Sequence, residues 1–578
     1  MTTKQLRLCI ASIVFLGCPG CSKQTGPTTA AQPAAQVAET VYRNGKIYTV
    51  DEARPWVEAV AIKDGKLIAV GSNDDVEAYV SEVTEVIELQ GKMVMPGIVD
   101  LHVHPFVTPL FNIINLDFSD PTNPETMMSE LGEFAAGHPD KKWIRGGSWG
   151  VGVFPGNNPS KALIDEVVSD RPVVLLDQTG HSYWLNSKGL ELSGIDADTV
   201  SDGLYVIEKD AKTGEPTGVV RESALRLVER VAEQPTEAEY AEAFAGVFRE
   251  FNSGGVTSMQ TAEGNTRWLD VVQGLEGNGQ LTMRLFIGWD WHTHQTTPYT
   301  NDEMDEQIAQ RAKYESALVS PNYVKIFLDG APDGYAVPFL EPYADGSGKH
   351  GVGKISPDEL RDAVIAFDAQ GVGTFMHSIG DASTRAALDA IEAARNANGQ
   401  TGARHKIAHL TWVHPDDVPR FGTIPGVAGE ISPAVPYPSA AFESYIGLVG
   451  EERYQRLFAA RSLIDAGAHL GYGSDWLTLI PPSPWMPMQG FVTRRNPAAP
   501  EKGELGQNET LTVEQVIRVF TINGAYAVGA EEQIGSIEVG KAADLIVLDR
   551  NLFEIPPTDI RNVRVLRTVL AGRVVHSE

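Results

Sequence analysis

The sequence predicts an α/β fold, a (β/α)8 TIM-like barrel with a small β-sandwich built from both chain ends. Through the middle of the chain, short runs rich in β-branched residues alternate with helical patterns, which is typical of βα units around a parallel sheet. Hairpin patterns precede this region, and further strand patterns follow it. The length of 578 residues suits one barrel with an insertion and an accessory domain.

The middle region offers nine strand candidates for an eight-stranded barrel. One candidate between residues 173 and 288 must therefore belong to an insertion, and the sequence leaves open which one. Residues 106–250 are too many for a single crossover and are expected to carry this insertion. The candidates are residues 98–101, 173–176, 256–260, 284–288, 323–327, 374–376, 406–408, 427–431 and 469–473.

Both ends of the barrel region carry strand patterns. Residues 41–95 alternate short apolar runs with turn pairs such as Asn44-Gly45 and Asp64-Gly65, which favour hairpins. Residues 534–578 add further apolar β-branched runs. We expect 41–95 and 534–578 to form one composite β-sandwich, which leaves 96–533 for the barrel.

The composition excludes several classes of protein. Hydrophobic residues make up 42% of the chain and charged residues 21%, which is typical of a folded globular protein with a large core. Lys and Arg number 47 against 76 Asp and Glu, giving a formal net charge of −29. Such a charge repels nucleic acids and anionic lipid surfaces, so we expect no nucleic-acid partner.

The N-terminus is typical of an exported protein. Lys4 and Arg7 precede an apolar run over 8–16 that is too short to span a bilayer. Residues 1–21 are expected to be a signal peptide with a lipoprotein cleavage site before Cys21, and residues 22–40 a flexible tether. Cys18 is the alternative lipidation site, and a secreted protein with incidental cysteines is the alternative fate. The expected location is periplasmic or at the cell surface, with a lipid anchor.

A pair of histidines indicates half of a metal site. His102 and His104 follow the strand candidate 98–101, and residues two apart on a strand point to the same side. Two imidazoles placed in this way can bind one divalent ion. The pair alone is a weak signal, because histidines at strand ends are often solvated or hydrogen-bonded. All three cysteines lie in the first 21 residues, so the folded region has none to offer a metal.

Five motifs in a fixed order carry a family resemblance. Met95-Pro96-Gly97 followed by Asp100-x-His102-x-His104 resembles the first metal-ligand strand of the amidohydrolase superfamily. Four further motifs follow in the order of that family: Val-Lys-Ile-Phe-Leu-Asp-Gly at 324–330, His-Ser-Ile-Gly-Asp at 377–381, Ile-Ala-His at 407–409 and Gly-Ser-Asp at 473–475. Over about residues 41–578 the chain resembles the YtcJ-like, amidohydrolase-3-type metal-dependent hydrolases.

The resemblance implies a site with two divalent metal ions, with zinc the expected metal. It also implies that Lys325 is carboxylated, because only the resulting carbamate can bridge two cations. Alternatives remain: Lys325 could pair with Asp329 in the core, His377 could be merely hydrogen-bonded, and Asp475 could cap a helix. The implied ligands are His102, His104, Lys325, His377, His409 and Asp475.

The expected reaction is hydrolysis of an amide or cyclic amide C–N bond in a small N-acyl or N-formyl compound. A water bridging two metal ions has its pKa lowered from about 15.7 towards 7, which makes hydroxide available. Asp475 is the expected catalytic residue, because it could accept the proton and pass it to the leaving nitrogen. A deaminase, an esterase or lactonase at the same site, and a non-catalytic metal- or solute-binding lipoprotein are the alternatives. Homo-oligomerisation is left open.

Four residues are expected to line the substrate pocket. His181 resembles a substrate-facing histidine of the family, and Trp289, Trp291 and His292 follow a strand end. Packing beneath a long loop is the alternative for the aromatic residues. The chain departs from the family pattern at Ala408, where Glu is common, and at 260–261, where the pattern often contains Asp; both positions shape the pocket wall.

Overall fold

The computed structural model describes residues 37–106, 116–150, 152–177, 182–201, 205–222, 224–291, 301–476 and 483–578. The predicted signal peptide, Cys21 and most of the tether lie outside these residues. Eight parallel strands form the main sheet in the order β21-β20-β19-β18-β17-β16-β15-β8. They are β8 (Ile98–Val103), β15 (Val256–Thr261), β16 (Arg284–Asp290), β17 (Val319–Phe327), β18 (Gly373–Ser378), β19 (His405–His409), β20 (Val427–Ile431) and β21 (Leu470–Tyr472).

The two edge strands of this sheet, β8 and β21, meet and bring the barrel close to closure. The backbone N–H of Asp475 donates to the His102 carbonyl at 2.7 Å, and that of His104 donates to the Trp476 carbonyl at 3.3 Å. Val103 and Trp476 form a parallel bridge. The predicted fold class is therefore confirmed. Because all eight strands are parallel, their carboxyl ends open on one face.

Helices cover the outside of the barrel. The longest of them, α7 and α11, pack against it through buried apolar residues, and α7 begins with a capping box between Thr236 and Glu239. No helix in the described residues is both long and apolar enough to cross a membrane. The barrel helices are α7 (Glu237–Ser253), α8 (Thr266–Gly277), α9 (Asn301–Ala309), α10 (Pro357–Ala369), α11 (Asp381–Asn398), α12 (Arg420–Thr423), α13 (Ala440–Glu443), α14 (Ile446–Val449), α15 (Glu451–Gln455), α16 (Ala460–Asp465), α17 (Trp485–Thr493), α18 (Val513–Phe520) and α19 (Ile522–Ala527).

The amino-terminal end of the barrel is filled with apolar side chains. Leu101, Phe286 and Tyr323 from three strands form one buried cluster with Ala525 and Ala527 of α19. This end of the barrel is therefore mainly apolar, whereas the predicted ligands lie at the carboxyl ends of the strands.

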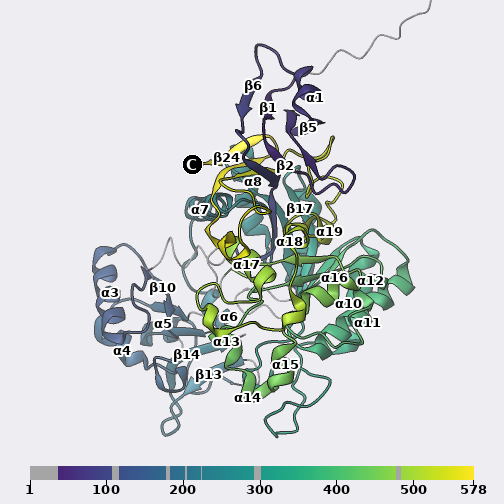
Figure 1. Ribbon diagram of the computed structural model, residues 1–578. Coiled ribbons are helices and arrows are strands. Elements are labelled where there is room, and N and C mark those ends of the chain that lie inside the picture. Colours follow the sequence, from purple (N-terminus) through teal and green to yellow (C-terminus); the bar gives the residue numbers. More distant parts are fainter. Residues whose placement is uncertain are drawn as a thin grey trace, which may run out of the picture. The chain divides into compact units, whose positions relative to one another are not determined.

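A separate six-stranded sheet makes up the insertion, in the order β13-β14-β12-β11-β10-β9. The strand candidate 173–176 is β11 of this sheet, so the eight other candidates form the barrel. In Figure 1 the insertion helices α3, α4 and α5 lie beside these strands and apart from the barrel helices α10 to α12. The elements are β9 (Leu116–Asp117), α3 (Pro124–Gly137), β10 (Ile144–Trp149), α4 (Lys161–Val167), β11 (Val173–Asp177), β12 (Ser182–Leu185), α5 (Ser187–Leu192), β13 (Tyr205–Lys209), β14 (Pro216–Glu222) and α6 (Leu225–Glu229).

Strands from the two ends of the chain lie side by side (Figure 1). One sheet, β24-β23-β22-β7-β2-β3, combines both ends, because β22 pairs with β7 in antiparallel register. A four-stranded sheet, β5-β4-β1-β6, comes from the N-terminal segment alone. The elements are β1 (Thr40–Arg43), β2 (Lys46–Tyr48), β3 (Trp56–Val57), β4 (Ala59–Lys63), β5 (Lys66–Gly71), α1 (Asn73–Glu77), β6 (Glu85–Glu88), β7 (Met93–Pro96), β22 (Leu545–Leu548), β23 (Val565–Leu570) and β24 (Arg573–Ser577).

Candidate metal centre

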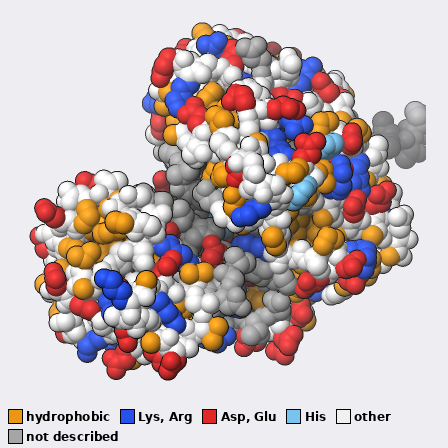
Figure 2. All heavy atoms as spheres, turned by 90° about the horizontal axis from the view of Figure 1, so that it is seen from below, with side chains coloured by type: hydrophobic (Ala, Val, Ile, Leu, Met, Phe, Trp, Pro, Cys, Tyr) orange, Lys and Arg blue, Asp and Glu red, His pale blue; other side chains and the backbone are white. Residues whose placement is uncertain are grey.

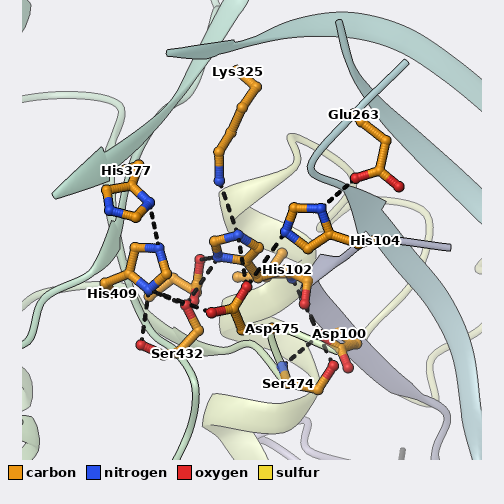
Figure 3. Close-up of polar contacts among 12 residues, drawn as sticks. Asp100, His102, His104, Glu263, Lys325, His377, His409, Ser432, Ser474 and Asp475 are labelled. Carbon is orange, nitrogen blue, oxygen red and sulfur yellow. Dashed lines mark hydrogen bonds and ion pairs between the residues drawn. The ribbon is translucent and has the colours of Figure 1, made fainter. Parts of the chain in front are cut away.

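The structure brings all six predicted ligands together at the carboxyl-terminal face of the barrel (Figure 3). His102 and His104 lie at the end of β8, and Asp475 follows β21. The parallel register places the ends of β17, β18 and β19 next to one another on the same face. These strands contribute Lys325, His377 and His409.

Three of these side chains have the geometry of a metal site. The Oδ1 atom of Asp475 lies 3.3 Å from His102 Nε2 and 3.5 Å from His104 Nε2. Two ligands of a tetrahedral zinc ion with bonds of about 2.0–2.1 Å lie roughly 3.3 Å apart. The ligand atoms of these three buried residues all lie within 4.8 Å of one another, so one divalent ion fits between them.

The ring nitrogens that would not bind metal are held by other groups. His104 Nδ1 lies 2.5 Å from the Glu263 carboxylate, and His102 Nδ1 lies 2.9 Å from the Ser432 hydroxyl. The same serine contributes its carbonyl at 3.0 Å from His409 Nδ1. Contacts of this kind fix the orientation and tautomer of a metal-binding imidazole. They leave the Nε2 atoms directed to the centre of the site.

His377 and His409 form the second half of the cluster. Their facing nitrogens, Nδ1 of His377 and Nε2 of His409, are 2.8 Å apart. His377 Nε2 lies 3.4 Å from Asp329, which also accepts hydrogen bonds from the backbone of Ile379 and Gly380. The Lys325 ammonium lies 2.9 Å from His102 Nε2, and in the view of Figure 3 its side chain enters the site between His377 and His104. A group that extends Lys325 would therefore lie between the two halves.

Two of these residues have a backbone conformation that residues other than glycine rarely adopt. His409 has φ of 71° and Asp475 has φ of 51°, both in the left-handed region. Each such residue costs about 1–3 kcal/mol unless it is glycine, so the surrounding fold must hold it there. Backbone strain of this kind concentrates at functional sites.

Burial and neighbouring charges set the protonation of the cluster. Burial lowers the pKa of His409 to about 4 and that of Lys325 to about 7. Burial opposes protonation of His104, but Glu263 and Asp475 raise its pKa to about 9. Burial likewise opposes ionisation of Asp475, yet the hydrogen bond from His104 and nearby positive charges lower its pKa to about 2. At neutral pH Asp475 is therefore an anion that can bind a cation or accept a proton.

Comparison with known proteins identifies the family. The sequence model of the amidohydrolase family matches residues 85–576. The chain belongs to the amidohydrolase family. This confirms the resemblance found in the sequence, and it makes the protein a metal-dependent hydrolase that acts on C–N bonds.

Individual members of the family align over nearly the whole chain. The N-substituted formamide deformylase of Arthrobacter pascens is 27% identical over 551 residues, covering 93% of this chain and 98% of the relative. The putative amidohydrolase YtcJ of Bacillus subtilis is 26% identical over 543 residues, covering 93% and 100%. An uncharacterized metal-dependent hydrolase from Pyrococcus horikoshii OT3 has the same fold, with a TM-score of 0.71, 22% identity, and coverage of 90% and 99%.

Several residues of this amidohydrolase site were missed by sequence reasoning. Glu263 follows β15 and pairs with His104. Glu430 of β20 lies 3.3 Å from His102 Nδ1 and 3.2 Å from Lys406 Nζ, and all three are buried. A glutamate and a lysine inside apolar strands were visible in the sequence as signals of a buried polar site. Ser432 gave no such signal.

Asp329, the alternative partner considered for Lys325, forms its hydrogen bonds with other groups. Asp329 accepts the backbone N–H groups of Ile379 and Gly380, whereas Lys325 contacts His102 and lies 3.8 Å from the centre of the Phe375 ring. Phe375 packs with Ala262 and Ala408, so the family departure at Ala408 makes this part of the wall apolar.

The predicted pocket residues have different outcomes. His181 and His292 lie outside the described residues. The structure corrects the placement of Trp289: it is fully buried in the main core and donates its indole N–H to the Pro321 carbonyl at 2.7 Å. Trp291 likewise packs against a barrel helix, through the ring of Phe367, and bonds Asp305. Successive strand residues alternate faces, so the tryptophans point outward and Asp290 points to the barrel interior.

Some buried polar side chains beside the cluster have no hydrogen-bond partner among the described residues. They include Asp290, which pairs in register with Lys325, and Gln260 of β15. Unsatisfied buried groups in native proteins often mark a site that a ligand or water completes. In the view of Figure 2 the molecule is hollowed, and both acidic and basic side chains are visible along the hollow.

Proposed function

We propose that this amidohydrolase cleaves the amide or cyclic amide C–N bond of a small N-acyl or N-formyl compound. The observation that carries the proposal is the arrangement of His102, His104 and Asp475 around one point. The Nδ1 atoms of the two histidines, which face away from this point, are held by Glu263 and Ser432. The name of the Arthrobacter relative, a deformylase of N-substituted formamides, supports the same class of substrate at 27% identity.

We further propose that the site binds two divalent ions, with zinc the expected metal, and that Lys325 is carboxylated. The pair of His377 and His409 would hold the second ion, and the extended Lys325 would reach both halves. When bound, the metal lowers the pKa of water and so supplies a hydroxide nucleophile at neutral pH.

The residues of the chain would then handle the protons. Attack of water on the carbonyl carbon forms a C–O bond and releases a proton, and breaking the C–N bond requires a proton on the departing nitrogen. Asp475 is ionised at neutral pH, so it can accept the first proton and deliver it to the nitrogen. Glu263 and Ser432 would keep the imidazoles oriented during this transfer. The products are a carboxylic acid and an amine.

The N-terminus supports a second part of the proposal. We propose that the enzyme is exported and anchored by a lipid on Cys21, because a charged start, a short apolar run and a polar tether precede the folded region. This location would place the reaction outside the cytoplasm.

The substrate class can be tested on a panel of formamides, N-acyl amides, cyclic amides, esters and lactones. The zinc-loaded protein should release amine and acid in equal amounts from at least one amide, and Asp475→Asn should not. Release of ammonia from aminated rings, or turnover of esters and lactones alone, would overturn the proposed function.

A further inference from the structure

Lys354 lies beside the metal centre and has no role in the site described above. Its ammonium is 5.4 Å from the centre of the Phe327 ring, and Phe327 stacks on His377 with ring centroids 5.0 Å apart. Its Cε atom is 3.7 Å from where a Cβ on Gly330 would lie. The side chain therefore lies beside the end of β17 and the segment after it, next to the half of the centre that contains His377.

The backbone fixes Lys354 in this place. Its N–H donates to the Leu328 carbonyl at 2.8 Å, and the N–H of Val352 donates to the Tyr335 carbonyl at 3.0 Å. Gly351, directly before Val352, has φ of 84°, and a Cβ there would lie 2.0 Å from the Val337 carbonyl oxygen. The loop can take this path because that position is glycine. Lys354 is thus held in place by the fold and is more than a mobile surface side chain.

No described carboxylate lies within ion-pair distance of the Lys354 ammonium. Within the described part of the chain it forms no ion pair, and the acidic groups whose charges act on it are Glu222 and Asp329. Asp329 is already engaged by two backbone N–H groups. Burial lowers the pKa of Lys354, because a half-buried ammonium loses part of its hydration. An anionic ligand would restore a partner for this cation.

We propose that Lys354 binds a carboxylate carried by the amine part of the substrate, so that the enzyme acts on N-formyl or N-acyl amino acids. The inference rests on the proposed function. In such a compound the carboxylate carbon lies roughly 3–4 Å from the scissile carbonyl carbon by covalent geometry. A short substrate of this kind could place its amide beside His377 and its carboxylate near Lys354, with the apolar ring of Phe327 next to both residues.

The test compares two substrates that differ in one group. Racemic N-formylleucine carries the carboxylate, and N-(3-methylbutyl)formamide has the same skeleton without it. Hydrogen bonds to charged groups account for about a 10- to 100-fold preference, so the wild-type enzyme should favour N-formylleucine by that factor in kcat/KM. Lys354→Met should raise KM for N-formylleucine by a similar factor and should change KM for the neutral formamide by less than about twofold. Lys354→Arg should restore much of the preference.

Lys349 on the same loop gives a matched control. Lys349 is exposed, and its ammonium lies 3.7 Å from the centre of the Tyr335 ring. Lys349→Met should therefore leave kcat/KM unchanged for both substrates. The subsite would be overturned if Lys354→Met favoured N-formylleucine over the neutral formamide by the same factor as the wild type. It would also be overturned if the wild type favoured the neutral formamide. If neither compound is hydrolysed, the proposed function fails for this substrate class. Calorimetry with N-formylleucine then tests the subsite alone: binding lost in Lys354→Met supports it, and equal binding overturns it.

Discussion

Carboxylation of Lys325 should make assembly of the active enzyme depend on carbon dioxide. The neutral amine attacks CO2, a C–N bond forms and a proton leaves, which gives a carbamate anion. We would strip the protein of metal with a chelator, hold it in CO2-free buffer, and return zinc with and without dissolved CO2. Lys325→Met is the matched variant, because it keeps a long side chain that cannot be carboxylated.

The expected magnitude follows from the burial of Lys325. Burial lowers its pKa to about 7, so about half of the amine is neutral at pH 7, against about one part in 3,000 for a lysine at its ordinary pKa. The neutral fraction rises from about a tenth at pH 6 to about nine tenths at pH 8. At a fixed CO2 concentration the carbamate should therefore form about tenfold faster at pH 8 than at pH 6.

Amide hydrolysis after timed reconstitution, together with ¹³C NMR of protein treated with ¹³C-bicarbonate, measures this effect. The wild type should show a carbamate resonance and regain activity faster with CO2 and at higher pH, whereas Lys325→Met should show neither. The reasoning would be refuted if the wild type regained activity at the same rate with and without CO2 and carried no ¹³C label.

Three further predictions concern single residues. Glu263→Gln should weaken zinc binding about 10- to 100-fold in a chelator competition, because it removes the carboxylate that holds His104. Zinc binding must also displace the proton of His104, whose pKa is about 9, so the zinc affinity of the wild type should increase about tenfold for each unit by which the pH is raised, up to pH 9. A zinc affinity that does not change with pH would contradict this. Asp475→Asn should keep the circular dichroism spectrum and lower kcat by at least about 10²–10⁴-fold, and near-normal turnover would exclude its role in proton transfer. Cys21→Ala should release the protein from membranes or block its processing; unchanged fractionation and mature mass would rule out the lipid anchor.

The ordered ligands could be predicted from the sequence because strand ends in a parallel barrel share one face. His102, His104 and Asp475 each follow an apolar strand, and the register of the sheet alone brings them together. Glu263 could not be predicted in this way, since its contact with His104 depends on the path of the chain after β15.

Two other features could not be read from local patterns. The strand at 173–176 has the same apolar character as the barrel strands, and its pairing with β10 and β12 is what shows that it belongs to the insertion. Trp289 was expected in the pocket because it lies near a strand end, but the alternation of the strand turns it into the core and turns Asp290 inward. Which face a residue takes depends on the register, and the sequence near a strand end leaves that register open.

The occupancy of the centre is tested most directly by a crystal structure of the zinc-loaded protein grown near neutral pH, with anomalous scattering measured at the zinc edge. Two peaks about 3.5–4 Å apart are expected, the usual spacing of two-metal sites, with added density on Lys325 joining them. One peak should lie among His102, His104 and Asp475 and the other beside His377 and His409. A single ion at full occupancy with unmodified Lys325 pointing away from it would contradict the two-metal centre.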